Sequence, residues 1–492
     1  MHFYIALRYT GFVSKRFRTC DLEQVFLLPP SLQDWLPENH LARFIAEVMN
    51  ELDLSAIYAK HKRADGRGLA AYHPLMMARL LLYAYCLGVT SSRKIERATR
   101  EDVAFRYLAA NQQPDHDTIA SYRQNNLQEL AGIFVQVLRL CEKAGLVKLG
   151  NIAIDGTKML ANASTGRSVP YAKLAEREKY WLEAVERLLR EAREKDQEED
   201  ARYGKGQKES SLPAELAQAQ SRLQRIQQAK AELEQEAQAQ LKVASEKHVV
   251  RKRGRPRKDD PPTAFASKQE QVKERNRYKR AQKNAAHPTR QYNFVDPDSR
   301  VMVDNRHKCF VQSYNAQVAV DSQAQVIVAA EITQQTNDCQ PLIPMVNSVQ
   351  AVTAAAPKTV LADAGYFDTE SLKDPSLEGI QVLVSPDAKP QSPATSSPPS
   401  KPYSAQALQM REALATEAGK ALYALRKTTV EPVFGQIKEG RNIRRFRFRG
   451  LKQVAAEWKL VCATHNLLKL FRQRVGLLAA SSLPAVAGTA MA

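Results

Sequence analysis

The spacing of apolar residues divides the chain into a helical first part and a second part that mixes strands with helices. Between about residues 20 and 150, apolar side chains recur every three or four positions, which is the spacing of one buried helix face. The clearest groups are Leu41, Phe44, Ile45, Val48, Met49 and Leu75, Met76, Leu80, Tyr83, Ala84. Another helix is expected to begin near residue 115, with Asp117 or Thr118 as its cap.

From residue 291 onward, short apolar runs separated by turn residues predict a sheet. Strands are expected at 299–303, 314–320, 326–332, 359–361 and 380–384, with a helix over 341–352. A β-branched run at 150–155 supplies one more strand, far earlier in the chain. We expect helices over 404–470, a loop rich in Pro, Ser and Lys over 386–402, and a disordered tail over 476–492.

Residues 166–290 interrupt the sheet pattern. Between about Leu174 and Ala237 the chain is rich in Glu, Lys, Arg, Gln and Ala, and it carries two apolar stripes at helical spacing. The stripes predict two antiparallel helices in a coiled-coil hairpin, which could also join two copies of the chain; the alternative is a charged linker. They consist of Trp181, Val185, Leu188, Ala192 and of Leu216, Leu223, Ile226, Ala229, Leu233.

A strongly basic run follows the hairpin, over residues 251–258. Its glycine and proline prevent a helix, and Arg253 and Arg255 flank the glycine in an Arg-Gly-Arg-Pro core. This core resembles an AT-hook, whose arginines enter a narrow minor groove of DNA. A solvated basic linker is the alternative.

Two short helices of the first part carry further candidate DNA contacts. Residues 91–100 have a basic face that includes Arg93, and the helix near residue 115 includes Arg123. Such a pair is compatible with a helix-turn-helix that contacts DNA, and equally with a plain helical bundle.

The amino-acid composition indicates which class of molecule the protein binds. The 492 residues carry a formal net charge of +19 and a pI near 9.6, which favours a polyanion such as nucleic acid over a membrane surface. The six cysteines are scattered without a CxxC pair, so neither a zinc finger nor a disulfide framework is expected. The chain lacks the pattern of a signal peptide and of a bilayer-spanning segment. We therefore expect a soluble cytoplasmic protein without a membrane partner.

Three acidic residues stand at related places in the expected element order, which is close to that of an RNase H-like fold. Asp155 ends the first strand, Asp363 follows the fourth, and Glu431 lies on a late helix. In such a sheet the first and fourth strands are neighbours. Three carboxylates brought together repel one another unless a cation is present, and Mg²⁺ prefers oxygen ligands; two such ions could assist phosphodiester cleavage. Taken singly, each residue has an ordinary alternative as a turn, cap or surface residue.

Several segments together resemble the DDE transposases of bacterial insertion sequences. They are residues 26–44, 154–158, 296–300, 314–317, 362–366, 430–438 and 465–468. The resemblance implies that Asp155, Asp363 and Glu431 form a catalytic triad that binds Mg²⁺, with Mn²⁺ as a substitute.

The resemblance also implies a tyrosine–arginine–glutamate–lysine signature, here Tyr423, Arg426, Glu431 and Lys438. Arg426 lies one residue further from Glu431 than the pattern asks, and Lys427 stands in the expected place. The base that holds the phosphate is therefore either Arg426 or Lys427, and Lys438 is implied to contact the DNA backbone.

A second basic run, residues 441–449, includes Arg444 and Arg445 and alternates guanidinium groups with aromatic rings. Alternation of this kind suits phosphate contact and base stacking. The alternative is a helix end that packs on its phenylalanines.

The implied fold class is α/β, with an RNase H-like catalytic core over 149–165 and 291–475. An all-α N-terminal DNA-binding domain is expected over 20–148, and an inserted helical coiled-coil hairpin with a basic linker over 166–290. The implied function is a transposase that binds terminal inverted repeats, cleaves DNA and transfers strands to target DNA, as a homodimer or higher assembly in the bacterial nucleoid. The alternatives are an inactive DNA-binding derivative and an RNase H-like nuclease without strand transfer.

Overall fold

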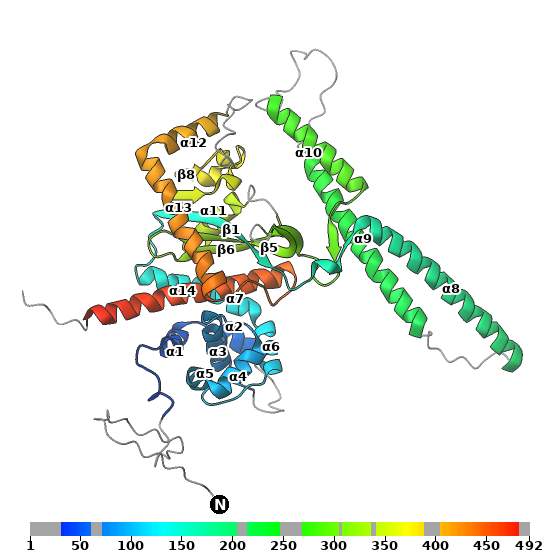
Figure 1. Cartoon of the computed structure of the whole chain (residues 1–492), viewed down its shortest axis with the longest axis horizontal. Coiled ribbons are helices and arrows are strands. Elements are labelled where there is room, and N and C mark those ends of the chain that lie inside the picture. Colours follow the sequence, from blue (N-terminus) through cyan, green and yellow to red (C-terminus); the bar gives the residue numbers. More distant parts are fainter. Residues whose placement is uncertain are drawn as a thin grey trace, which may run out of the picture.

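A computed structural model gives the fold of residues 31–60, 71–203, 214–246, 268–304, 308–335, 341–387 and 404–481. The first part is helical, as its apolar spacing predicted, and lies below the sheet in Figure 1. Its helices are α1 (Leu41–Glu51), α2 (Ser55–Lys60), α3 (Pro74–Cys86), α4 (Ser92–Glu101), α5 (Val103–Leu108), α6 (His116–Asn125) and α7 (Leu127–Lys143).

The start of α6 differs from the expected one. The helix begins at His116, and its cap is Asp115, whose carboxylate accepts a hydrogen bond from the Thr118 backbone N–H at 2.8 Å. Asp117 and Thr118, the expected caps, already lie inside the first turn. Sequence favoured them because aspartate and threonine are common caps, but only a residue just outside the helix can satisfy its free N–H groups.

A six-stranded mixed sheet forms the centre of the second part. Its strand order is β4-β5-β1-β7-β8, and β6 pairs with the remaining length of β5. β1 is antiparallel to β5 and parallel to β7, and β7 is parallel to β8. The strands are β1 (Asn151–Leu160), β4 (Arg300–Asp304), β5 (Cys309–Asp321), β6 (Ile327–Thr333), β7 (Thr359–Ala362) and β8 (Gln381–Val384). The first and fourth strands of this core, β1 and β7, are therefore neighbours, as expected.

The helices after β6 are α11 (Leu342–Thr353), α12 (Ala405–Ala415), α13 (Glu417–Gly435) and α14 (Leu451–Ser481). α13 crosses β1, and α14 lies between β6 and the helices α3 and α7 of the first part (Figure 1). Two expectations are corrected here. Residues 441–450 are not helical, so the helices do not fill 404–470 without a break, and residues 476–481 of the expected disordered tail continue α14.

One hydrophobic core runs from the N-terminal helices into the sheet. Its centre is α14, where the Trp458 side chain is fully buried and its indole N–H donates to the Gln317 carbonyl of β5 at 3.0 Å. Glu457, also buried, accepts a hydrogen bond from the Tyr85 hydroxyl of α3 and from two backbone N–H groups. Burial raises the pKa of this carboxyl, and the hydrogen bonds oppose that rise. The helices of the first part are thus packed tightly against the rest of the chain.

Two glycines with a left-handed backbone, one after α3 and one after α7, allow a matched pair of substitutions. Gly88 has φ +76°, and a Cβ atom there would lie 1.8 Å from the Arg441 carbonyl oxygen. Gly145 has φ +72° with open space around it. We expect Gly145→Ala to cost about 1 kcal/mol, from the left-handed backbone alone, and Gly88→Ala about 2–4 kcal/mol because the Arg441 backbone must also move. Chemical denaturation of both variants measures the difference, and equal losses would show that the contact at Gly88 is unimportant.

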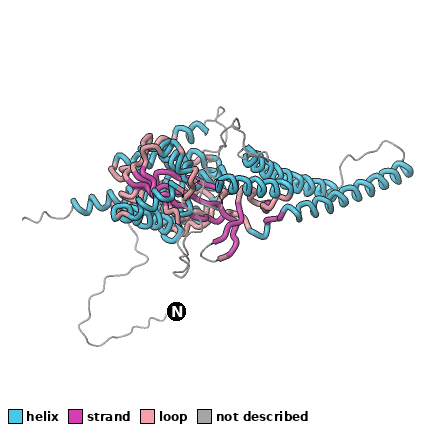
Figure 2. Tube along the Cα trace, turned by 90° about the horizontal axis from the view of Figure 1, so that it is seen from above, coloured by secondary structure: helices cyan, strands magenta, loops and turns pink. Residues whose placement is uncertain are grey.

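The described residues of 168–203, 214–246 and 268–293 form an arm that projects from the sheet (Figure 2). Its base is a pair of antiparallel strands, β2 (Ser168–Pro170) and β3 (Gln291–Asn293). Its helices are α8 (Tyr171–Tyr203), α9 (Ala214–Glu246) and α10 (Lys268–Ala286). The predicted hairpin is present, since Leu174 of α8 packs against Leu233 of α9 and Val185 against Leu216. The stripe proposed to join two copies is therefore occupied within one chain.

α10 was not expected, because only a basic linker was predicted between the hairpin and residue 290. It packs antiparallel to the C-terminal part of α9, while α8 covers the N-terminal part. Arg253, Arg255 and most of the predicted loop 386–402 lie outside the described residues. In the part of the chain that the structure describes, each helix is too short or too polar to cross a membrane.

Candidate active site

Asp155 and Asp363 follow equivalent positions on neighbouring parallel strands. The pairing of β1 with β7 ends at Ile154 and Ala362, so the next residue of each strand is one of the two aspartates. The expectation that Asp155 ends its strand was wrong, because β1 continues to Leu160 along the longer strand β5. Asp155 therefore sits on a rigid strand, while Asp363 begins a 3₁₀ turn and is about half exposed.

Arg426 of α13 lies between the two aspartates. Its guanidinium is 3.8 Å from the Asp155 carboxylate and 3.3 Å from the Asp363 carboxylate, and the residue is only 8% exposed. The ring of Tyr423, one helical turn earlier, lies 5.8 Å from the guanidinium carbon. Burial raises the pKa of Tyr423, the Arg426 charge lowers it, and the Asp363 charge raises it. These four side chains form one cluster, which we call the aspartate–arginine cluster.

Glu431 does not join this cluster. It is exposed on α13, and among the described residues no three histidine, cysteine, aspartate or glutamate side chains lie close enough together to hold a metal ion. A π-helical turn, Gln436–Gly440, follows α13 and changes the angle between successive side chains. In a regular α-helix the seven-residue spacing of Glu431 and Lys438 would put them on one face, and the π-helical turn removes that relation. The role of Glu431 in the triad stays a prediction.

Lys438 lies in the π-helical turn and points at β1. Its ammonium donates to the Thr157 hydroxyl at 2.5 Å and to the Lys158 carbonyl at 2.8 Å. Thr157 is two residues beyond Asp155 and so lies on the same face of β1. Burial lowers the pKa of Lys438, and the charge of Asp304 opposes that shift. Arg426 and Lys438 thus approach the same face of one strand from α13 and the turn after it.

Gln317, Asn315 and Tyr366 form a hydrogen-bonded group next to Asp155 that was not predicted. Gly156 pairs with Gln317 on β5, and a Cβ atom at Gly156 would lie 2.1 Å from the Gln317 side-chain nitrogen. That nitrogen donates to the Asn315 side-chain oxygen at 3.1 Å, and the Tyr366 hydroxyl bonds the other side of the Gln317 amide. The quoted segments 154–158, 314–317 and 362–366 therefore meet at one place. Only a glycine beside Asp155 leaves room for this network.

The basic run 441–449 is extended rather than helical. Leu160, the last residue of β1, bonds the backbone of Arg444 and Phe446, which prolongs the sheet by one short pairing. Phe446 is buried, whereas Arg445 is exposed, as alternation along an extended segment requires. Arg444 is half-buried and forms an ion pair with Glu439. The alternative of a helix end packed on phenylalanines is thus half right, since only the packing is observed.

A groove of about 510 Å³ opens beside this extended segment. Three arginines from separate places in the chain line it: Arg167, Arg445 and Arg449. The Arg449 guanidinium donates to the Asn162 carbonyl at 3.0 Å, which holds it at the rim. The groove lies at the end of β1, five residues beyond Asp155.

Of the remaining described residues predicted to contact DNA, two are exposed and one is buried. Arg93 on α4 and Lys427 on α13 are exposed. Arg123 on α6 is buried: its guanidinium donates to the Thr90 carbonyl at 2.6 Å and stacks 5.5 Å from the centre of the Phe448 ring. An arginine whose donors are used inside the fold does not reach a phosphate, so Arg123 is not available as the DNA contact predicted for this helix.

The donor chemistry of the cluster fits a hard divalent cation in part. Asp155 and Asp363 supply carboxylate oxygens directed at one positive group, the Arg426 guanidinium, and such oxygens are the ligands that Mg²⁺ prefers. Glu431, the expected third ligand, is not assembled with them.

Comparison with protein families gives two matches. Residues 30–125, which contain α1 to α6, match a family described as a transposase domain (DUF772). Residues 393–471, which contain α12, α13 and most of α14, match a transposase DDE domain. Searches of curated proteins and of solved structures found no match. The second match covers Tyr423, Arg426, Glu431 and Lys438, and lies outside Asp155 and Asp363.

Proposed function

We propose, on the premise that the two family matches support an insertion-sequence DDE transposase, that this chain cuts and rejoins DNA at the ends of such an element. The single observation that carries the proposal is the pair Asp155 and Asp363, each directly beyond the paired residues of the parallel strands β1 and β7, with an arginine of the matched domain between them.

The catalytic core is proposed to be RNase H-like. The strand order β6-β5-β1-β7-β8, with three antiparallel strands followed by two parallel ones, supports this assignment. It agrees with the element order on which the sequence analysis relied. The helix α13 crosses the sheet at β1 and β7 and carries Arg426 and Tyr423 beside the two aspartates, which also supports the assignment.

Asp155 and Asp363 would hold Mg²⁺ or Mn²⁺, together with Glu431 once α13 brings that carboxylate to them. A divalent ion there would supply positive charge that offsets the charge of the phosphate as it reacts. Arg426 and Tyr423 would orient the scissile phosphate, and Lys438 would fix the backbone next to it. The reaction class is phosphodiester cleavage followed by transfer of the freed 3′-hydroxyl to target DNA.

DNA on either side of the scissile phosphate would be held by exposed basic groups. Arg445 and Arg449 line the groove at the end of β1, and Lys427 is exposed on α13. The N-terminal helices, with Arg93, would contact the terminal inverted repeats. Because two ends must be brought together, we propose at least two copies of the chain in the active complex, at the nucleoid.

The proposal is tested with a plasmid that carries the native DNA flanking the reading frame on both sides of a marker. Excision of the marker and its appearance in a second plasmid support a transposase. Cleavage without joined products favours the nuclease alternative. Binding without cleavage, at several Mg²⁺ and Mn²⁺ concentrations, favours the inactive derivative.

Arg426 is expected to compete with the divalent ion for the two aspartates. Its guanidinium lies 3.3 to 3.8 Å from both carboxylates, and an internal competitor lowers the apparent affinity for an external cation. We therefore expect Arg426→Gln to bind Mn²⁺ about tenfold more tightly, measured by titration calorimetry or by the EPR signal of free Mn²⁺. DNA cleavage by the same variant should fall, because the phosphate loses a partner.

The matched control is Lys427→Gln, which removes a positive charge one residue away on the exposed face. It should leave Mn²⁺ affinity unchanged. If Arg426→Gln binds Mn²⁺ no more tightly than the wild type, the idea of competition is wrong. Circular dichroism of each variant establishes that the fold is retained.

A further inference from the structure

α10 differs in charge from the two helices it accompanies. It carries seven lysine or arginine residues and two glutamates, whereas α8 has eight basic against ten acidic residues and α9 has four against five. The positive charge of the arm is therefore concentrated on its third helix. A helix whose only task was to cover α9 would need no such excess.

Three basic residues of α10 form an exposed row along one side of the helix. Tyr278, Ala281 and Ala285 are half-buried on the side that meets α9. Arg275, Lys279 and Lys283 are exposed, and their spacing of four residues aligns them along one side of the helix, about 6 Å apart. Among the described residues, these three have no ion-pair partner within 4 Å. Their charge is free to meet an anion.

A groove of about 1150 Å³ lies between α10 and the end of α9. Arg277, Arg280 and Lys283 line one wall, and Gln240 lies on the other, where its side-chain oxygen accepts from Asn284 at 3.0 Å. Arg277 reaches Glu274 at 3.7 Å, which neutralises little of the charge at this exposure. The groove and the row of cations beside it form one positive surface.

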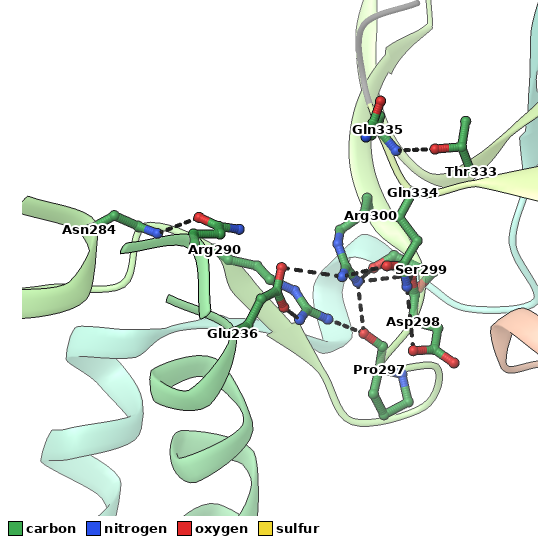
Figure 3. Close-up of polar contacts among 11 residues, drawn as sticks. Glu236, Asn284, Arg290, Pro297, Asp298, Ser299, Arg300, Thr333, Gln334 and Gln335 are labelled. Carbon is green, nitrogen blue, oxygen red and sulfur yellow. Dashed lines mark hydrogen bonds and ion pairs between the residues drawn. The ribbon is translucent and has the colours of Figure 1, made fainter. Parts of the chain in front are cut away.

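This surface is held in a fixed place relative to the sheet. Glu236 of α9 forms ion pairs with Arg290, just before β3, and with Arg300 of β4 at 3.5 Å (Figure 3). Arg300 is mostly buried and also donates to the Gln334 side chain at 3.0 Å, and burial lowers its pKa to about 10. Gln334 in turn donates to the Asp298 carbonyl at 2.7 Å. The network connects Glu236 of α9 to β4, which is an edge strand of the core.

We propose that the surface formed by α10 and its groove with α9 binds the phosphate backbone of duplex DNA, without reading sequence. This inference rests on the proposed function, because it names where DNA outside the active site is held. Charge complementarity favours DNA: a duplex presents one negative charge per ~1.7 Å, and regularly spaced cations neutralise several phosphates at once. An anionic membrane is a poorer match, because membrane-binding helices expose an apolar face, and that of α10 is used against α9.

The test compares full-length proteins for binding to a fluorescein-labelled 40-base-pair duplex of mixed sequence, by anisotropy over a range of NaCl concentrations. The variant carries Arg275→Gln, Lys279→Gln and Lys283→Gln together. We expect its affinity to fall on the order of tenfold or more at moderate salt, and the slope of log affinity against log salt to decrease by roughly 2 to 3, which is about 0.9 per lost phosphate contact.

The matched control removes three exposed charges from the acidic helix α8, as Arg177→Gln, Lys179→Gln and Arg190→Gln. An equal loss of affinity and slope in the control would overturn the proposal, since it would reflect net charge alone. An unchanged slope in the α10 variant, or binding by the wild type to phosphatidylserine vesicles that the α10 variant loses while its DNA binding remains, would also overturn it. Cleavage that depends on Asp155 tests the proposed function separately, so the two ideas can fail independently.

Discussion

Asp155→Asn and Asp363→Asn should each reduce DNA cleavage on the order of 10³-fold while leaving DNA binding intact. Each substitution keeps the size of the side chain and removes its charge, so the fold and the neighbouring strands β1 and β7 are preserved. In the proposed metal-binding role, each substitution removes an anionic oxygen ligand and the charge stabilisation that it gives to the reaction; about 4 kcal/mol corresponds to a thousandfold in rate. Removing negative charge near DNA should leave its affinity unchanged or slightly higher.

Single-turnover cleavage of the flanking-DNA substrate measures the effect, and anisotropy on the same DNA measures binding. Glu378→Gln is the control, because Glu378 is an exposed acid of the same part of the chain, outside the aspartate–arginine cluster. Cleavage at the wild-type rate by both aspartate variants would exclude this cluster as the catalytic centre. A loss confined to one variant would show that the two aspartates do not act as a pair.

Trp458→Ala should lower the free energy of unfolding by about 3–5 kcal/mol, the range for a fully buried large aromatic residue replaced by alanine. The Trp458 indole fills the junction between α14 and the sheet, and its edge meets the Phe446 ring, with 6.3 Å between ring centres. Its loss leaves a cavity and also deprives the Gln317 carbonyl of its indole partner. Because one core joins the N-terminal helices to the sheet, the weakening should be felt by both.

Urea unfolding followed by circular dichroism measures this loss. Trp35→Ala is the matched control, since Trp35 is 53% exposed and the same substitution there should cost less than about 1 kcal/mol. Similar midpoints for the two variants would contradict the assignment of Trp458 to the centre of the fold.

The parts of the fold set by local pattern were predictable from the sequence. The run before Asp155 and the run before Asp363 are short, apolar and β-branched, and their adjacency follows from the element order. The relation of Arg426 to them was not predictable, because it depends on how α13 rotates as it crosses β1. Sequence spacing fixes which residues share a helix face, but it does not fix which face meets the sheet.

The wrong prediction for Arg123 and the unpredicted helix α10 also have tertiary contacts as their physical cause. Arg123 carries the charge expected of a DNA contact, yet Thr90 and Phe448, from distant segments, provide it with an acceptor and an aromatic face inside the fold. α10 escaped notice because its apolar residues are few and mostly alanine, so it lacks the strong stripe that marks α8 and α9. Whether a long polar side chain is buried depends on tertiary contacts, and so does the stability of a helix that packs against one neighbour. A single sequence does not display those contacts.

The strand pair β2–β3 brings the two ends of the arm side by side, from Ser168 to Asn293, before either rejoins the sheet. More than a hundred residues therefore leave and return through a two-strand neck without lengthening any path within the core. Such a module can be gained, lost or exchanged between lineages with little disturbance of the chemistry it serves. In the proposed roles, DNA binding by the arm and DNA cleavage by the core can therefore change independently during evolution.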